Sequence, residues 1–159
     1  MLKQELRDPA TYNAVIAAIA GGASRLKEIA TKAGIGTSAC SNLLTSLIAL
    51  GLVKKEVPVT ENRSRRIVYL LADQMFRFWY RFVFPNLNTI MMGKGEDIFR
   101  EVIEPELSSY MGPVFEEMAA QYLWHLEDAP FTFQKVGRWW GPNPLKKRQE
   151  EIELLAFRD

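Results

Sequence analysis

The chain has 159 residues, of which 48% are hydrophobic and 25% are charged. This composition is that of a globular protein and excludes an intrinsically disordered chain. No apolar run approaches the roughly 18 residues that cross a bilayer, and the start MLKQELRDPATY lacks the apolar core of a signal peptide. The single cysteine, Cys40, excludes an internal disulfide framework. We therefore expect a cytoplasmic protein with no membrane partner.

The charges are distributed unevenly along the chain. Residues 1–84 carry 12 Lys and Arg against 6 Asp and Glu, whereas residues 85–159 carry 8 against 13. A basic first half and an acidic second half predict two units with different partners. We place the first domain at residues 1–72 and the second at residues 73–159.

A first helix is predicted from Asp8 to the pair Gly21-Gly22. Asp8 is an N-cap acceptor. Pro9 suits the first helical position, because the N–H that proline lacks would have no partner within the helix there. The residues expected to face the core recur at helical spacing: Tyr12, Val15, Ile16 and Ile19.

Two further helices follow, joined by the turn GIGTS. Ser24 is the expected cap of the second helix, which ends at Gly34. The third helix is expected to be capped by Thr37 or Ser38 and to end at Gly51. Its expected core residues are Leu43, Leu47 and Leu50. Two helices joined by a short glycine-containing turn are typical of a helix-turn-helix.

The segment after the third helix predicts a β-hairpin. LVKKEVPV reads as a strand, TENRSRR as a polar turn and IVYLLA as a second strand. Three helices followed by a hairpin resemble the winged-helix family, in its MarR-like or ArsR-like style, over about residues 9–72. The resemblance implies that the third helix enters the major groove of double-stranded DNA and that the hairpin, or wing, contacts phosphates.

The candidate DNA-binding residues fall into two sets. The third helix offers hydrogen-bonding side chains at Thr37, Ser38, Ser41, Asn42 and Thr45, and the wing offers cations at Arg63, Arg65 and Arg66. Asn42 suits adenine, and cations supply most of the non-specific affinity. Two alternatives stay open, because the wing cations could only be solvated and winged helices also serve as protein-docking modules.

The second unit is predicted to be helical at first and to end in strands. Asp73 caps the apolar segment QMFRFWYRFVFP, which we expect to be a buried connector, and Gly112-Pro113 is expected to start another helix. The residues expected to face inward on that helix are Val114, Phe115, Met118, Tyr122 and Leu126. Two strands are then predicted, Phe131–Trp140 and Ile152–Phe157, joined by a loop. The predicted fold class is mainly α with small β, a winged helix followed by a helical unit and a short, incomplete α/β segment.

No metal or nucleotide site is expected. His125 is the single histidine and has no Cys or His partner at ligand spacing. The segment Gly93-Lys94-Gly95 lacks the GxxxxGK[ST] spacing of a phosphate loop.

Taken in order, the segments LRDPATYNAVIAAIAGG, FRFWYRFVFPN, GPVFEEMAAQYL and GRWWG resemble the C-terminal half of a family of archaeal and bacterial AAA-type ATPases. In that family a P-loop domain precedes the winged helix, and a domain resembling the PD-(D/E)XK nuclease fold follows it. The resemblance implies that the chain is a fragment cut at both ends, with the ATPase domain as a missing partner.

The resemblance also implies two nuclease-type acids. Glu116 would be a supporting carboxylate, and Glu153 stands where relatives usually have Asp. The third carboxylate and the lysine of such a site are absent, so we expect no catalysis and no cofactor; Mg²⁺ would be needed only if nuclease activity survives in a longer chain.

The predicted function is a non-catalytic, DNA-binding regulatory part of an ATPase. The alternatives are a docking module for the ATPase domain or for a second copy, and a remnant of a nuclease. An unpaired strand edge after Phe157 also predicts self-association into a homo-oligomer.

Overall fold

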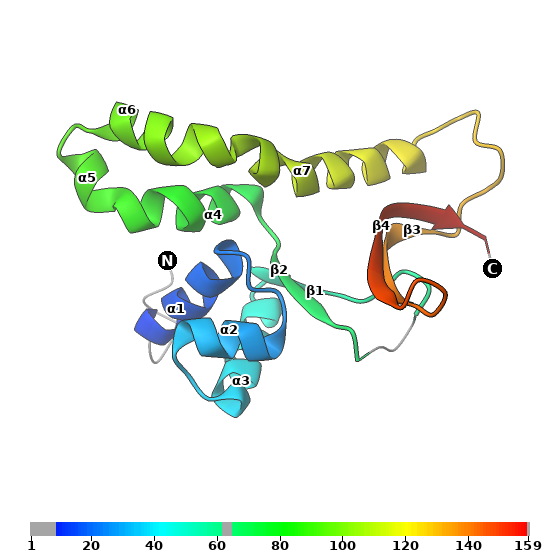
Figure 1. Cartoon of the computed structure of the whole chain (residues 1–159), viewed down its shortest axis with the longest axis horizontal. Helices are drawn as coiled ribbons and strands as arrows, with labels where there is room; N and C mark the ends of the chain where they lie inside the picture. The colour runs from blue at the N-terminus through cyan, green and yellow to red at the C-terminus, as the bar shows by residue number, and fades with distance from the viewer. Residues whose placement is uncertain (1–8, 62–64, 159) are drawn as a thin grey trace. The chain divides into compact units, whose positions relative to one another are not determined.

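The computed structural model describes residues 9–61 and 65–158. Within these residues the chain is mainly helical and carries two small antiparallel sheets of two strands each (Figure 1). The predicted fold class, including the winged helix-turn-helix, is therefore confirmed. The chain forms two compact units: unit 1 comprises Met1–Glu56 and Val68–Glu104, and unit 2 comprises Val57–Ile67 and Pro105–Asp159.

Unit 1 begins with α1, Pro9–Ala20, and Pro9 occupies the first helical position as predicted. The predicted cap, Asp8, lies outside the described residues. Val15, Ile16 and Ile19 are buried, as their helical spacing predicts. The α1 helix therefore contributes one apolar face to the core of this unit.

The next helix, α2, spans Leu26–Ala33. The prediction that Ser24 caps it is wrong, because the N-cap residue is Arg25. The Glu28 carboxylate accepts hydrogen bonds from the backbone N–H groups of Ser24 and Arg25, at 3.2 and 3.1 Å. Gly34 closes the helix with a left-handed backbone (φ 67°), which glycine adopts without the steric cost of a Cβ.

The third helix, α3, spans Thr37–Ala49, and Gly36 is its N-cap, so the predicted caps Thr37 and Ser38 are wrong. They lie inside the first turn because the extended backbone ends one residue earlier, at Gly36. The buried residues are Cys40, Leu44 and Leu47. Of the predicted core positions, Leu47 is confirmed, Leu43 is half-buried, and Leu50 is wrong because it is 42% exposed at the C-terminal end of the helix.

The predicted hairpin is confirmed as β1, Val53–Glu56, paired antiparallel with β2, Val68–Leu71. Val53 stands opposite Leu71, and both are buried in the core of the three helices. The strands are shorter than predicted, and beyond β1 the N–H of Val59 donates to the Arg138 carbonyl, outside the hairpin.

The rest of unit 1 is a run of short helical segments. These are α4 (Gln74–Phe78), η1 (Trp79–Val83), η2 (Phe84–Asn86), α5 (Leu87–Met91), α6 (Gly95–Ile98) and η3 (Phe99–Ile103). The predicted cap is confirmed, because the Asp73 carboxylate accepts from the N–H of Phe76 at 2.8 Å. The prediction of a fully buried connector is wrong in part, since Phe82 is buried but Met75 is 68% exposed.

Unit 2 contains most of α7, Glu104–Trp124. The prediction that Gly112-Pro113 starts a helix is wrong, because Pro113 lies inside α7. A proline removes one backbone hydrogen bond and can kink a helix without always ending it. Phe115, Met118 and Tyr122 were predicted to face inward, and this is also wrong, since each is more than half exposed.

The predicted order of strand, loop and strand is confirmed, but three of the four bounds differ: β3 spans Lys135–Asn143, where Phe131–Trp140 was predicted, and β4 spans Arg148–Phe157, where Ile152–Phe157 was predicted. The strands pair antiparallel from Lys135 opposite Phe157 to Asn143 opposite Arg148, with an irregularity between Gly137 and Trp139. Within the described part of the chain, β4 pairs with β3 alone. Self-association through its outer edge stays a prediction.

Candidate nucleic-acid interface

The exposed face of α3 gathers the polar side chains that the sequence predicts as DNA contacts. At 100° per residue, Ser38, Ser41, Asn42 and Thr45 lie on one side of the helix, opposite Cys40, Leu44 and Leu47. Ser38, Asn42 and Thr45 are exposed, Ser41 is half-buried, and Thr37 is exposed in the first turn. The structure thus brings all five predicted residues of this helix onto accessible surface; their contact with DNA stays a prediction.

The five side chains differ in their freedom to bind a ligand. Thr45 Oγ1 donates to the Ser41 carbonyl at 3.0 Å, which leaves that hydroxyl with its acceptor capacity. Asn42 has no side-chain hydrogen bond within the described residues. Because an Asn amide offers both a donor and an acceptor, Asn42 is the side chain of α3 best suited to a base edge.

Cys40 anchors the opposite side of α3. Its side chain is fully buried in the helical core, and burial raises the pKa of the thiol above its usual value. A buried, protonated thiol behaves as a small apolar group, so Cys40 holds the helix in place and is unsuited to nucleophilic chemistry.

The cations of the predicted interface belong to segments other than α3. The helix itself contains no Lys or Arg, whereas Lys54 and Lys55 of β1 are exposed. Of the wing arginines, Arg63 lies outside the described residues and Arg65 is exposed.

Arg66 is held inside unit 2. Its Nη1 donates to the Trp140 carbonyl at 2.8 Å, the indole N–H of Trp140 donates to the Arg66 carbonyl at 3.0 Å, and the guanidinium forms an ion pair with Glu61. We call these three residues the Arg66 clasp. A guanidinium already engaged with a carboxylate and a carbonyl has less capacity for phosphate than an exposed one.

Two glycines of β3 make room for the segment that carries the clasp. A Cβ on Gly141 would overlap the Arg66 guanidinium, and one on Gly137 would stand 3.2 Å from the Val59 side chain. The N–H of Val59 also donates to the Arg138 carbonyl at 2.8 Å. Sequence reasoning missed this contact; the signal that could have revealed it is glycine inside a strand, which often marks the close approach of another chain segment.

The two nuclease-type acids lie in different surroundings. Glu116 of α7 forms an ion pair with Arg138 (Oε2 to Nε, 3.1 Å), and Arg138 also pairs with Glu151. Glu153 of β4 is exposed. In the part of the chain that the structure describes, no three His, Cys, Asp or Glu side chains gather where they could hold a metal ion. Glu116 is thus placed to hold α7 against β3, and a catalytic role for it or for Glu153 stays a prediction.

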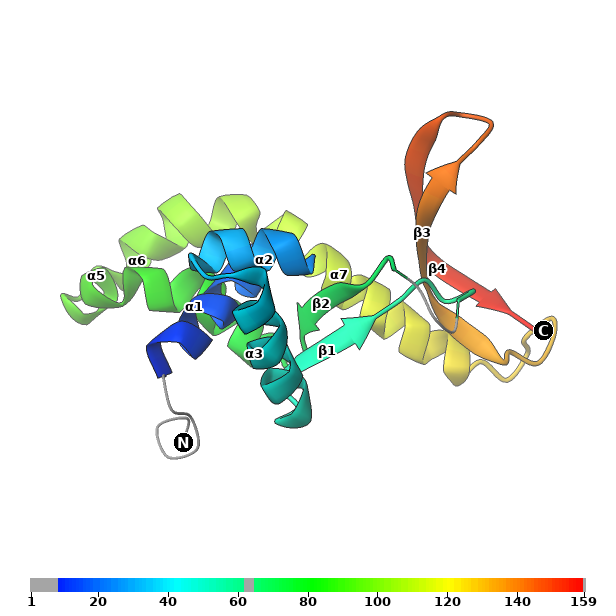
Figure 2. The same cartoon turned by 90° about the horizontal axis from the view of Figure 1, so that it is seen from below.

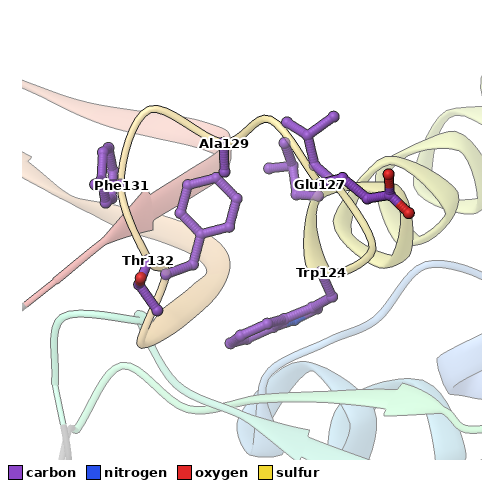
Figure 3. A pocket seen from close by; sticks show the side chains of 8 residues that line it. Trp124, Glu127, Ala129, Phe131 and Thr132 are labelled. Carbon is purple, nitrogen blue, oxygen red and sulfur yellow. The ribbon is translucent and has the colours of Figure 1, made fainter.

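An open hollow of about 460 Å³ lies between the C-terminal end of α7 and the loop that precedes β3 (Figure 3). Its aromatic lining comes from Trp124, Phe131 and Phe133, and the rings of the two phenylalanines meet edge to face with centroids 5.1 Å apart. The lining includes Glu127 and contains no Lys or Arg. A phosphate would meet a carboxylate there and no cation, so we do not assign the hollow to nucleic acid.

Among the described residues, no helix has both the length and the apolar composition that crossing a bilayer requires.

Comparison with known proteins identifies both parts of the chain. The family model DUF234, "Archaea bacterial proteins of unknown function", matches residues 79–159, and an IclR helix-turn-helix domain model matches residues 14–56. The second match runs from within α1 to the end of β1 and thus includes α3. The predicted helix-turn-helix and a domain of unknown function are therefore confirmed, whereas the links to AAA-type ATPases and to PD-(D/E)XK nucleases stay predictions.

One relative is the uncharacterized protein MJECL04 of Methanocaldococcus jannaschii, which is 35% identical over 164 residues. The alignment covers 100% of this chain and 35% of the relative, so the chain spans about a third of the length of that protein.

Two solved structures are similar at low TM-scores. Lactococcus lactis ZitR in complex with DNA has a TM-score of 0.41 and 15% identity, covering 74% of this chain and 80% of that chain. A Listeria innocua protein with unknown function has a TM-score of 0.35 and 18% identity, with coverages of 71% and 73%.

Proposed function

The chain belongs to the DUF234 family of archaeal and bacterial proteins of unknown function, and we propose that its winged-helix domain binds double-stranded DNA through the exposed face of α3. The observation that carries this proposal is the polar surface of α3. An exposed helix face with Ser38, Asn42 and Thr45 side by side offers donors and acceptors at the spacing of a groove-reading helix. The match of this segment to the IclR helix-turn-helix domain supports the same reading.

The charge distribution suggests how affinity and specificity are divided. Because α3 carries no cation, its contacts would select bases and add little to non-specific affinity. Phosphate contacts would come from exposed cations elsewhere, and Lys54 and Lys55 of β1 are candidates. Each phosphate contact adds about 0.9 to the slope of log affinity against log salt, so these two lysines alone would give a slope of about 2.

Fluorescence anisotropy with a labelled duplex at two salt concentrations tests the proposal. We expect binding that weakens as salt rises, and an Asn42→Ala protein that binds its preferred sequence about tenfold more weakly. Asn88→Ala is the matched control, because Asn88 is an exposed asparagine of α5, in a different part of unit 1. Absence of binding at low salt would refute the proposal, and equal losses in both variants would refute the role of α3.

We further propose that this DNA-binding activity serves a larger P-loop ATPase. The proposal rests on the sequence resemblance to AAA-type ATPases, and it is compatible with a relative about three times as long as this chain. Mixing the chain with the P-loop part of such a protein and measuring ATP hydrolysis with and without duplex DNA tests it. Hydrolysis that responds to neither the chain nor DNA would contradict it.

A docking role is the second candidate function, and the Arg66 clasp favours it. A wing arginine that is engaged within the protein suits a structural wing better than one that contacts DNA. Light scattering after size-exclusion chromatography separates the two functions. A stable dimer, or a stable complex with the P-loop part, would favour docking if duplex DNA does not displace it.

A further inference from the structure

The turn between β3 and β4 is a second exposed surface with a distinctive composition. It carries Leu145, Lys146 and Lys147 between the last residue of β3 and the first residue of β4, and Figure 2 shows the two strands leading into it. Leu145 is 94% exposed. We call Leu145, Lys146, Lys147 and Arg148 the hairpin tip.

The backbone of the hairpin tip is ordered by one side chain. Asn143 Oδ1 accepts hydrogen bonds from the N–H groups of Leu145 and Lys146, at 3.0 and 3.1 Å. Lys147 has a left-handed backbone, with φ 50°. That conformation is disfavoured for residues with a Cβ, and turns use Gly or Asn there at lower cost. A left-handed Lys therefore occupies a position where turn geometry alone would favour another residue.

The hairpin tip is electrostatically positive. Lys146, Lys147 and Arg148 are exposed, and the Glu150 carboxylate forms ion pairs with Lys146 and Arg148. Hydrogen bonds from Lys146, which has the largest effect, and from Asn143 and Arg148 together lower the pKa of Glu150 from its usual 4.5 to about 2. Three cations against one carboxylate leave an excess of positive charge, and within the described residues the Lys147 side chain forms no ion pair.

We propose that the hairpin tip is a second nucleic-acid contact, in which the cations bind phosphates and Leu145 enters the minor groove. This inference rests on the proposed DNA-binding function and extends it to unit 2. Apolar wedges flanked by Lys and Arg are a recurrent means of engaging the minor groove. The cations supply charge that α3 lacks, while Leu145 supplies apolar contact.

A bilayer surface could also attract cations and an apolar residue, but the composition of the tip favours nucleic acid. Interfacial membrane binding scales with apolar area, and a single leucine beside Pro144 provides little of it. Cations that touch phosphates need no such area. The IclR-type domain of the same chain points to the same partner.

Matched pairs of variants test the proposal, each measured by anisotropy on duplex DNA across a salt series. Lys147→Ser should weaken binding and reduce the salt slope by about 1, whereas Lys94→Ser, which removes the same charge from an exposed position of unit 1, should change neither. Leu145→Ser should weaken binding about tenfold, and Met92→Ser, at a residue 79% exposed in unit 1, should not. Glu150→Gln should strengthen binding by up to about fivefold, because it removes the local counter-charge.

The outcomes separate this inference from the proposed function. If Asn42→Ala weakens binding while the tip variants match their controls, the tip proposal is refuted and DNA binding through α3 stands. If the tip variants weaken binding and Asn42→Ala does not, the tip stands and the α3 interface fails. Binding to phosphatidylserine vesicles without binding to duplex would overturn both, and circular dichroism confirms that each variant folds.

Discussion

Replacing Gly141 by Ala should displace Arg66 from its clasp. A Cβ at position 141 would overlap the guanidinium and would also stand 3.1 Å from Cζ2 of Trp139. Arg66 is only partly exposed, with 29% of its side chain accessible, and its Nη1 donates to the Trp140 carbonyl at 2.8 Å. The side chain can move only by giving up that hydrogen bond and its ion pair with Glu61.

The size of the effect follows from what is lost. Losing a hydrogen bond from a charged group costs about 1.5–3 kcal/mol of folding stability. The Gly→Ala change offsets about 0.4–1 kcal/mol of that loss, because alanine lowers the conformational entropy of the unfolded chain. We therefore expect Gly141→Ala to lower the free energy of unfolding by about 1–2 kcal/mol. For a chain of this length that corresponds to a Tm decrease of roughly 2–8 °C.

The assay is thermal unfolding followed by circular dichroism and by tryptophan fluorescence. Gly112→Ala is the matched control, because Gly112 lies inside α7, has no neighbour that a Cβ would meet, and should gain about 1 kcal/mol from helix propensity. The two Gly→Ala changes should thus shift stability in opposite directions.

A double-mutant cycle supplies the decisive comparison. With Arg66 already changed to Ala, Gly141→Ala should cost little, so the coupling between the two positions should be about 1–2 kcal/mol. Equal costs in the presence and absence of the Arg66 side chain would show that the guanidinium does not occupy the space above Gly141.

Three other consequences can be measured directly. Asp73→Ala should lower the free energy of unfolding by about 1 kcal/mol in urea denaturation, because it removes the cap that accepts from the Phe76 N–H. Because the pKa of Glu150 falls to about 2 in the folded protein, its contribution to stability is present above pH 4.5 and is lost as pH falls towards 2; Glu150→Gln should flatten stability over that window, and an NMR titration that puts this pKa near 4.5 would contradict the network. The buried Cys40 thiol should react with a thiol reagent only as fast as the protein opens, and immediate reaction of the native protein would contradict its burial.

Sequence reasoning succeeded where local pattern and tertiary structure agree. Val15, Ile16 and Ile19 recur at helical spacing, and the structure buries all three. The polar positions of α3 were predictable for the same reason, since a helix with one apolar face must present its other face to solvent. The Asp73 cap also depends on neighbouring residues alone.

The failures have identifiable physical causes. Periodicity shows that Phe115, Met118 and Tyr122 share a helix face, but it cannot show whether anything covers that face, and the structure leaves each exposed. The Arg66 clasp joins Arg66 to Trp140, 74 positions away, and the glycines of β3 indicate only that some segment approaches the strand, not which one. Local propensity predicts a helix start at Gly112-Pro113, but α7 already begins at Glu104, so Pro113 lies inside the helix.

If α3 reads bases and the hairpin tip binds phosphates, variants of the two surfaces should change different measured quantities. A side chain that reads a base changes the ratio of affinities for different sequences, whereas a side chain that binds phosphate changes the salt slope for every sequence. Asn42 belongs to the first kind, because α3 is uncharged, and Lys147 belongs to the second, because it is an exposed cation. An Asn42→Ala protein should therefore lose discrimination at an unchanged slope, while a Lys147→Ser protein should lose slope at unchanged discrimination. If both variants altered the same quantity, base reading and phosphate binding would not be separated between α3 and the hairpin tip.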